Sequence, residues 1–364
     1  MNMRLILVAA LCATVAGPAG AEETPAQVAA ALGLKESAAP VREMNGWTPP
    51  HKIVVVVDKA ERLAWLQDSV KGVTIAAVRT PKEAFAQIPD ADAYLGFCQA
   101  QLLATGKNLK WIHSLQAGIE TCLTPKVRDG GVLFTNVQRM NGSNVSEHAM
   151  ALLLALTRQI NVALANQEDG RWDAQNMRNV MDLDGKTMLI TGLGSIGTEI
   201  AKRASAFGMR VIATRLAGPE APPFVARIGL PAELPAMIGE ADVVVNATPL
   251  TPQTLHMFDA AMFARMKSTA YFINVGRGES VVTNDLIAAL TSGKIAGAGL
   301  DVTDPEPLPK GHPLWDIANV IITPHAAGTS ELKNERGWIV TRENMRRYVA
   351  GEKMYSVVDV KRGY

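Results

Sequence analysis

The sequence is poor in cysteine, aromatic residues and net charge. Its 364 residues include three cysteines, with no Cys-x-x-Cys pair and no cysteine–histidine spacing of the kind that holds a metal. The net charge is +1 at pH 7, and the tryptophans do not alternate with basic residues. Nothing in the sequence therefore supports binding to metal, nucleic acid or an acidic membrane surface. At 48% hydrophobic residues, the chain is long enough for two hydrophobic cores.

The N-terminal segment differs from this ordinary composition. Arg4 precedes an uncharged run over 5–20, which ends in Ala-Gly-Ala before two glutamates. This pattern predicts a secretory signal peptide over 1–21, and the alternative is an N-terminal extension that stays attached. The apolar part is short for a transmembrane helix, and no twin arginine is present. We expect an exported, periplasmic protein without membrane attachment if the leader is cleaved, and a cytoplasmic protein otherwise.

Two features follow the leader. Residues 22–50 are rich in alanine, proline and glutamate, which predicts a linker or a loosely packed arm. After cleavage only Cys98 and Cys122 remain. They could form a disulfide in an oxidising compartment or stay as two buried thiols, and the sequence leaves both possibilities open.

Strands and helices alternate from residue 53 onwards. The β-branched run 53–57 is typical of a strand buried on both faces of a parallel sheet. A long apolar helix is expected at 147–160. The other expected strands are 73–78, 93–97, 187–191, 210–214, 243–246, 271–274, 296–300 and 320–323, and the other expected helices are 60–67, 198–207 and 333–350.

This alternation predicts an α/β protein with two Rossmann-like, doubly wound parallel-sheet domains and an active site in the cleft between them. The expected substrate domain is 51–150, completed by 330–364. The expected NAD(P)-binding domain is 151–329.

A glycine-rich turn lies between an expected strand and an expected helix. It reads Gly192-x-Gly194-x-x-Gly197. The first glycine allows a tight turn, the second lets the backbone approach a pyrophosphate, and the third lets the helix pack closely on the strand. In this setting the motif predicts a dinucleotide site, and the alternative is a glycine turn without a ligand.

The residue after the next strand bears on the choice of cofactor. NAD enzymes usually place an acid there, but this chain has Arg215, with no acid before Glu220. A guanidinium can pair with a 2′-phosphate and cannot accept hydrogen bonds from ribose hydroxyls. The sequence therefore favours NADP over NAD, and the alternative is a solvated arginine in a site of mixed preference.

Three residues downstream of the turn form an ordered set: Arg277, Glu306 and His325. Each alone has an ordinary explanation, as a surface charge, a loop acid or a helix cap. Together, behind a dinucleotide turn, they predict transfer of a hydride to or from a small acid. The protein must then hold the acid, orient its carbonyl and move one proton.

The chain resembles the D-isomer-specific 2-hydroxyacid dehydrogenase family over residues 53–364. The resemblance rests on the glycine turn and on segments 111–120, 131–158, 248–251, 272–278, 297–309 and 323–328. It implies a substrate domain made from both chain ends, an inserted cofactor domain, and usually a homodimer. The implied reaction is reduction of a 2-oxo acid to a D-2-hydroxy acid by NAD(P)H.

The resemblance also implies roles for individual residues. His325 would be the acid/base, Glu306 would orient its imidazole, and Arg277 would grip the substrate carboxylate and carbonyl. Backbone amides of Ala117, Gly118 and Ile119 would bind the substrate carboxylate. Besides the glycines and Arg215, the implied cofactor-binding residues are Ser195, Ile196, Thr248, Val275, Gly276, Arg277 and Asp301, the last near the nicotinamide amide.

Some residues depart from the family pattern or have weaker predictions. The leader and Arg215 are unusual, and Phe97 falls in a loop that touches the substrate side chain in the family. This favours an aromatic or apolar substrate group there. Among the other histidines, His148 is expected in the core and His113 near the cleft. His51, His256 and His312 are expected in loops or at the surface.

Two rival functions are compatible with such a fold. The formate branch of the same superfamily places a glutamine beside its histidine, so Glu306 argues against a formate or phosphite dehydrogenase. A nucleotide-sensing binding protein on the same fold would not need the intact Arg277, Glu306 and His325 set. The sequence does not identify the 2-oxo acid.

Overall fold

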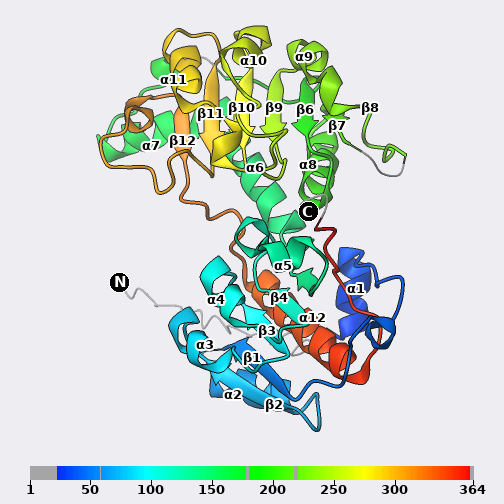
Figure 1. Cartoon of the computed structure of the whole chain (residues 1–364). Coiled ribbons are helices and arrows are strands. Elements are labelled where there is room, and N and C mark those ends of the chain that lie inside the picture. Colours follow the sequence, from blue (N-terminus) through cyan, green and yellow to red (C-terminus); the bar gives the residue numbers. More distant parts are fainter. Residues whose placement is uncertain (1–22, 58, 178–179, 217–219, 361–364) are drawn as a thin grey trace, which may run out of the picture.

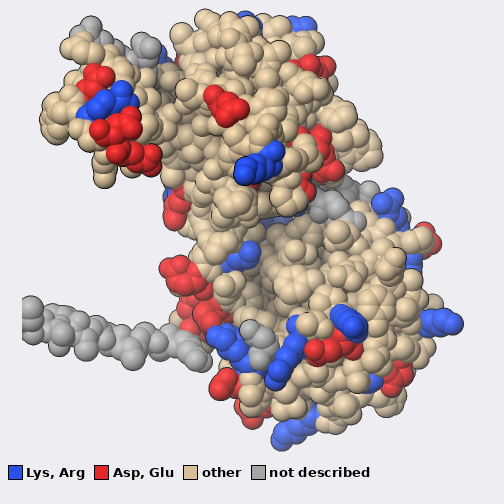
Figure 2. Space-filling model, turned by 90° about the vertical axis from the view of Figure 1, so that its left-hand side faces the viewer, with Lys and Arg blue, Asp and Glu red and all other residues tan. Residues whose placement is uncertain are grey.

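The computed structural model describes residues 23–360 except 58, 178–179 and 217–219 (Figure 1). The predicted signal peptide, 1–21, lies outside the described residues. The described chain forms two parallel sheets, one of five strands and one of seven. Each is flanked by helices, so the predicted α/β architecture with two parallel-sheet units is confirmed. Figure 2 shows two lobes with a recess in the surface between them.

The first sheet has the strand order β2-β1-β3-β4-β5. Its interior strand β1 is buried over Ile53, Val54 and Val55 because helices cover both faces of the sheet. The strands are β1 Lys52–Val56, β2 Thr74–Val78, β3 Ala93–Gly96, β4 Trp111–Ser114 and β5 Leu133–Asn136. The helices are α2 Ala60–Gln67, α3 Pro81–Gln87, α4 Ala100–Thr105, α5 Pro125–Arg128 and the long α12 Glu331–Ala350.

The second sheet has the strand order β12-β11-β10-β9-β6-β7-β8. The order reverses at β6, which is where open α/β sheets bind ligands at the carboxyl ends of their strands. The strands are β6 Thr187–Thr191, β7 Arg210–Thr214, β8 Arg227–Gly229, β9 Val243–Asn246, β10 Tyr271–Asn274, β11 Gly297–Leu300 and β12 Val320–Ile322. The helices are α8 Ser195–Ala206, α9 Leu234–Met237, α10 Ala260–Arg265 and α11 Thr283–Thr291.

Helix α6, Gly142–Thr157, runs from the first unit to the second, where it packs on α8 and on strands of the second sheet (Figure 1). The helix expected at 147–160 is therefore present but starts earlier. It ends where Gln159 adopts a left-handed φ of 54°, and α7, Ile160–Glu168, begins in a new direction. In the described chain no single helix is long and apolar enough to cross a membrane. Helices α6 and α7 pass that test only as a pair bent by 68°.

The segment predicted as a loose arm is packed against the first unit. It contains α1, Pro25–Leu32, whose Val28 is fully buried and which contacts α12. Glu23 accepts two hydrogen bonds from Arg336, at 2.7 and 2.8 Å. The prediction of a loose arm is wrong because a few apolar side chains and this ion pair anchor a segment whose average composition resembles a linker.

Short 3-10 helices complete the described structure: Val41–Glu43, Glu120–Cys122, Gln175–Met177, Pro231–Glu233, Ile238–Glu240, Gly278–Ser280 and Pro313–Asp316.

Candidate active site

The glycine-rich turn connects β6 to α8. Gly192 has a φ of +87°, a left-handed conformation that favours glycine, and the amides of Gly192 and Leu193 both donate to the carbonyl of Thr214. A Cβ on Gly197 would lie 2.2 Å from the Gly192 carbonyl oxygen. The turn is thus fixed to the end of β7. Helix α8 packs so close to the turn that position 197 has room only for a glycine.

Gly194 differs from its two partners, because a Cβ there would meet nothing within 4 Å. Helix α8 begins at the next residue, with no side-chain hydrogen bond at its N-cap and no acid in its first turn. The amide dipoles of the first turn of a helix favour an anion. Open space over Gly194, in front of that helix end, fits a dinucleotide pyrophosphate.

A buried polar network lies at the carboxyl ends of β6, β9 and β10. Asn246, fully buried, donates to Asn274 Oδ1 at 3.0 Å and to Ser280 Oγ at 2.7 Å. Its own Oδ1 accepts bonds from the hydroxyls of Thr191 at 3.1 Å and Thr248 at 2.7 Å. Sequence reasoning missed Thr191, Asn246, Asn274 and Ser280. The available signal was a polar residue ending each apolar strand.

This network fixes the backbone around Arg277. Asn274 Nδ2 and Ser280 Oγ both donate to the Arg277 carbonyl, at 3.0 and 2.6 Å, and the Gly276 amide donates to Asn274 Oδ1. A Cβ on Gly276 would lie 2.8 Å from the Thr248 carbonyl oxygen. The half-buried Arg277 therefore extends from a rigid turn, and its Nη1 donates to the Gly276 carbonyl at 2.8 Å.

Asp301, 3% exposed, fixes the loop that carries His325. Its Oδ1 accepts bonds from the Thr323 hydroxyl at 2.6 Å and the Ala326 amide at 2.9 Å, and its Oδ2 accepts from the Ala327 amide at 3.1 Å. The His325 amide donates to the Asp301 carbonyl at 2.8 Å, and His325 has a φ of 52°. The buried carboxylate thus stabilises a left-handed turn, a conformation that is uncommon for residues other than glycine.

The structure brings His325 and Glu306 into direct contact. Nδ1 of the imidazole lies 2.6 Å from Oε1 of the carboxylate. An ionised carboxylate can only accept, so Nδ1 carries the hydrogen and Nε2 is left to exchange a proton. The side chains are 48% and 41% exposed, so solvent or a substrate can reach the pair.

Two other histidines take defined positions. His148, on α6, was expected in the core and is only partly buried, with its side chain 25% exposed. Its Nε2 lies 2.8 Å from the Thr323 hydroxyl and 3.5 Å from Asp301, so it supports the loop of His325. The expectation that His113 lies near the cleft is wrong. It is fully buried between Thr135 and Thr341, and burial lowers its pKa to about 3.

The loop with Ala117, Gly118 and Ile119 follows β4. Asn136, at the end of β5, donates to the Ala117 carbonyl at 2.8 Å. The Cys122 amide donates to the Ile119 carbonyl, and Cys122 forms a disulfide with Cys98. The open question about the two cysteines is therefore answered. The disulfide ties this loop to the loop of Phe97.

The chain between β5 and α6 contacts both halves of the site. A Cβ on Gly142, the first residue of α6, would lie 3.4 Å from the carbonyl oxygen of Ser195 in the first turn of α8. A Cβ on Gly328, three residues after His325, would lie 3.5 Å from Asn141 Nδ2 and 3.6 Å from Lys333 Nζ. Residues 141–142 therefore lie close to both the glycine turn and the His325 loop.

The remaining predicted cofactor residues lie around the same strand ends. Ser195 and Ile196 form the first turn of α8, Val275 is buried directly after β10, and the amide of Arg215 donates to the Gly229 carbonyl at 3.0 Å. Among the described residues, no group of three or more histidines, cysteines or acids is placed to hold a metal ion.

Comparison with known proteins identifies the family. The NAD binding domain of the D-isomer specific 2-hydroxyacid dehydrogenases matches residues 150–327. Human glyoxylate reductase/hydroxypyruvate reductase is 34% identical over 258 residues, which are 70% of this chain and 78% of that protein. The chain belongs to the D-isomer specific 2-hydroxyacid dehydrogenase family. The resemblance expected from the motifs is confirmed, and with it membership of a family of NAD(P)-dependent oxidoreductases.

Further relatives support membership of this family. Glyoxylate reductase of Korarchaeum cryptofilum is 31% identical over 73% of this chain and 82% of that protein. The structure of NADPH-dependent glyoxylate/hydroxypyruvate reductase from Sinorhizobium meliloti, in complex with NADP and sulfate, has a TM-score of 0.73 and 27% identity. It covers 86% of this chain and all of that one.

Proposed function

We propose that the protein reduces a 2-oxo acid to a D-2-hydroxy acid. The observation that carries the proposal is the 2.6 Å contact between His325 and Glu306 on a loop fixed by Asp301. A bound reduced nicotinamide would supply the hydride to the carbonyl carbon. His325 Nε2 would give its proton to the carbonyl oxygen, and in the reverse direction it would take that proton back.

The remaining residues hold the acid and neutralise charge. Arg277, on its rigid turn, would bind the substrate carboxylate and stabilise the negative charge that develops on the carbonyl oxygen. The backbone amides of Ala117, Gly118 and Ile119 would bind the carboxylate from the substrate-domain side. Glu306 would keep Nδ1 protonated and the imidazole ring oriented.

We propose NADPH as the preferred cofactor, with NADH as the weaker one. Arg215 follows β7 at the position where an acid would bind the ribose of NADH. The Sinorhizobium meliloti relative is named NADPH-dependent and was solved with NADP.

We propose that the protein is exported after cleavage of residues 1–21 and forms a homodimer. The leader pattern and the Cys98–Cys122 disulfide support export, because disulfides persist in oxidising compartments. Exposed apolar side chains on and after α7 support a second copy as partner, since Leu164 is 55% exposed and Trp172 is fully exposed. N-terminal sequencing of the mature protein and light scattering test the two statements. An intact leader in the cytoplasm or a monomer would contradict them.

The decisive assay uses protein without residues 1–21 and follows consumption of NADPH and NADH with glyoxylate, hydroxypyruvate, pyruvate and phenylpyruvate. Turnover of any of these acids supports the proposal. Oxidation of formate or phosphite with NADP⁺, and no reduction of 2-oxo acids, would support the rival branch. Arg277→Gln separates an enzyme from a nucleotide sensor. In an enzyme this substitution should abolish most of the turnover, whereas a sensor carrying it should still bind the cofactor and its partner.

A further inference from the structure

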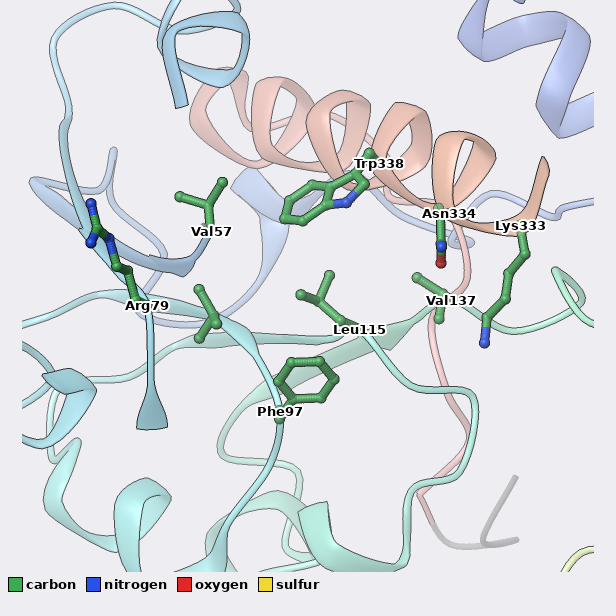
Figure 3. Close-up of a pocket in the computed structure, with 10 residues that line it drawn as sticks. Val57, Arg79, Phe97, Leu115, Val137, Lys333, Asn334 and Trp338 are labelled. Atoms are coloured by element: carbon green, nitrogen blue, oxygen red, sulfur yellow. The ribbon is translucent and has the colours of Figure 1, made fainter. Parts of the chain in front are cut away.

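A cavity of ≈330 Å³ lies in the first unit, at the carboxyl ends of its strands. Its walls come from the end of β1, from residues that follow β1, β2, β3, β4 and β5, and from the first turns of α12 (Figure 3). In Figure 3, Phe97 and Trp338 lie on opposite sides of the cavity with Leu115 between them. Six lining side chains are apolar: Val56, Val57, Phe97, Leu115, Val137 and Trp338. The polar lining residues are Arg79, Lys333 and Asn334, and in Figure 3 Arg79 lies on the side of the cavity away from Lys333 and Asn334.

The two aromatic walls are held in place. The guanidinium of Arg62 lies 5.4 Å from the ring centroid of Trp338 and pairs with Glu335 at 3.0 Å. The Phe97 carbonyl accepts a hydrogen bond from the Tyr94 hydroxyl at 3.0 Å, and its neighbour Cys98 is in the disulfide. These contacts hold the Phe97 backbone and the Trp338 ring beside the cavity.

The end of the cavity nearest the His325 loop carries a cation. Lys333, which lines the cavity, places Nζ 3.6 Å from the Cβ position of Gly328. Burial lowers the pKa of Lys333, as expected for an ammonium group partly withdrawn from water. An amphiphile with an anionic head at this end and an apolar tail in the cavity would match both surfaces.

We propose that the substrate is a 2-oxo acid with a bulky apolar side chain, aryl or branched alkyl, seated between Phe97, Leu115 and Trp338. The inference rests on the proposed function and specifies its substrate class. Glyoxylate has no side chain and would leave these walls in contact with water. A bulky apolar group would remove that surface from water, which stabilises the complex roughly in proportion to the area buried.

The test compares kcat/KM for phenylpyruvate, 4-methyl-2-oxopentanoate, glyoxylate and hydroxypyruvate at saturating NADPH. We expect the two bulky acids to exceed glyoxylate by about ten-fold or more, the range that apolar pockets provide. Phe97→Ala should lower the phenylpyruvate-to-glyoxylate ratio by about ten-fold. Phe207→Ala is the matched control, since Phe207 is 45% exposed, against 42% for Phe97, and is the C-cap of α8. The control should leave the ratio unchanged.

Calorimetry of phenylpyruvate against protein with NADP⁺ present gives a readout independent of turnover. Tighter binding than glyoxylate, weakened by Phe97→Ala, supports the inference. Glyoxylate or hydroxypyruvate reduced as well as the bulky acids, or a ratio that Phe97→Ala leaves unchanged, overturns it while the proposed function stands. Failure to reduce every 2-oxo acid overturns the proposed function itself.

Discussion

Oδ1 of Asp301 accepts a hydrogen bond from the Thr323 hydroxyl at 2.6 Å, two residues before His325 in the chain. The same carboxylate accepts hydrogen bonds from the amides of Ala326 and Ala327, which follow His325 directly. Asp301 therefore fixes the backbone on both sides of His325, while Glu306 fixes the imidazole. A fixed imidazole of this kind suits the proposed role of His325, because a proton donor must deliver its proton to one position.

The first prediction concerns the charge that orients the imidazole. Glu306→Gln keeps a hydrogen-bonding group but removes the negative charge beside Nδ1, so kcat should fall by about 100-fold or more. NADPH affinity, measured by fluorescence titration, should stay unchanged because Glu306 contacts the histidine. Glu168→Gln, an exposed acid at the end of α7, is the control. Unchanged kcat in Glu306→Gln would contradict the assigned role.

The second prediction concerns the network behind Arg277. Ser280→Ala removes the acceptor of Asn246 and a donor to the Arg277 carbonyl. Leaving a buried donor unpaired costs about 1–3 kcal/mol, so the free energy of unfolding should fall by that amount. The KM for the 2-oxo acid should rise more than the KM for NADPH. Ser292→Ala, an exposed serine at the end of α11, should change neither. Equal changes in stability and KM from Ser280→Ala and Ser292→Ala would argue against a role for Ser280 in positioning Arg277.

The sequence predicted those features whose signal is local. The strand-turn-helix setting of Gly192–Gly197 and the order of Arg277, Glu306 and His325 are readable along the chain. The features it missed depend on contacts distant in sequence. Gly278 must be glycine because a Cβ would lie 1.8 Å from the Thr303 carbonyl oxygen, and no local pattern reveals that neighbour. His113 was misplaced for the same reason, because Thr341 of α12 covers it.

The third prediction concerns cofactor choice. Arg215→Ala should raise the KM for NADPH by about ten-fold to 100-fold, because a hydrogen bond to a charged group contributes about 1.5–3 kcal/mol. The KM for NADH, which has no 2′-phosphate, should change little. Arg171→Ala, an exposed arginine after α7, controls for a general loss of positive charge. An equal rise in the KM for NADPH and for NADH would show that Arg215 does not bind the 2′-phosphate.

The fourth prediction concerns the disulfide. Cys98→Ser combined with Cys122→Ser opens a crosslink between residues 24 apart in the sequence, which should lower the free energy of unfolding by about 3 kcal/mol. Because the crosslink joins the loops of Phe97 and Ala117, the KM for the acid should rise while NADPH affinity stays constant. Denaturant unfolding and steady-state kinetics measure both effects. Reduction of the native protein should reproduce them, and an unaltered KM would limit the disulfide to a stabilising role.

The fifth prediction concerns pH and His113. Burial lowers the pKa of His113 from 6.5 to about 3, so between these values the unfolded chain binds a proton that the folded chain excludes. Stability should therefore fall as the pH falls from 6.5 towards 3, by up to about 1.4 kcal/mol per pH unit. His113→Gln should flatten this slope in urea titrations. His51→Gln, with a side chain 90% exposed, should not.

The most direct test of the account is to mix the protein lacking residues 1–21 with NADPH and phenylpyruvate, and to measure NADPH consumption and product configuration together. The account predicts one D-2-hydroxy acid formed for each NADPH consumed, with turnover lost in His325→Gln although NADPH still binds. Folded protein that binds NADPH but consumes none with phenylpyruvate, glyoxylate, hydroxypyruvate or pyruvate would contradict it.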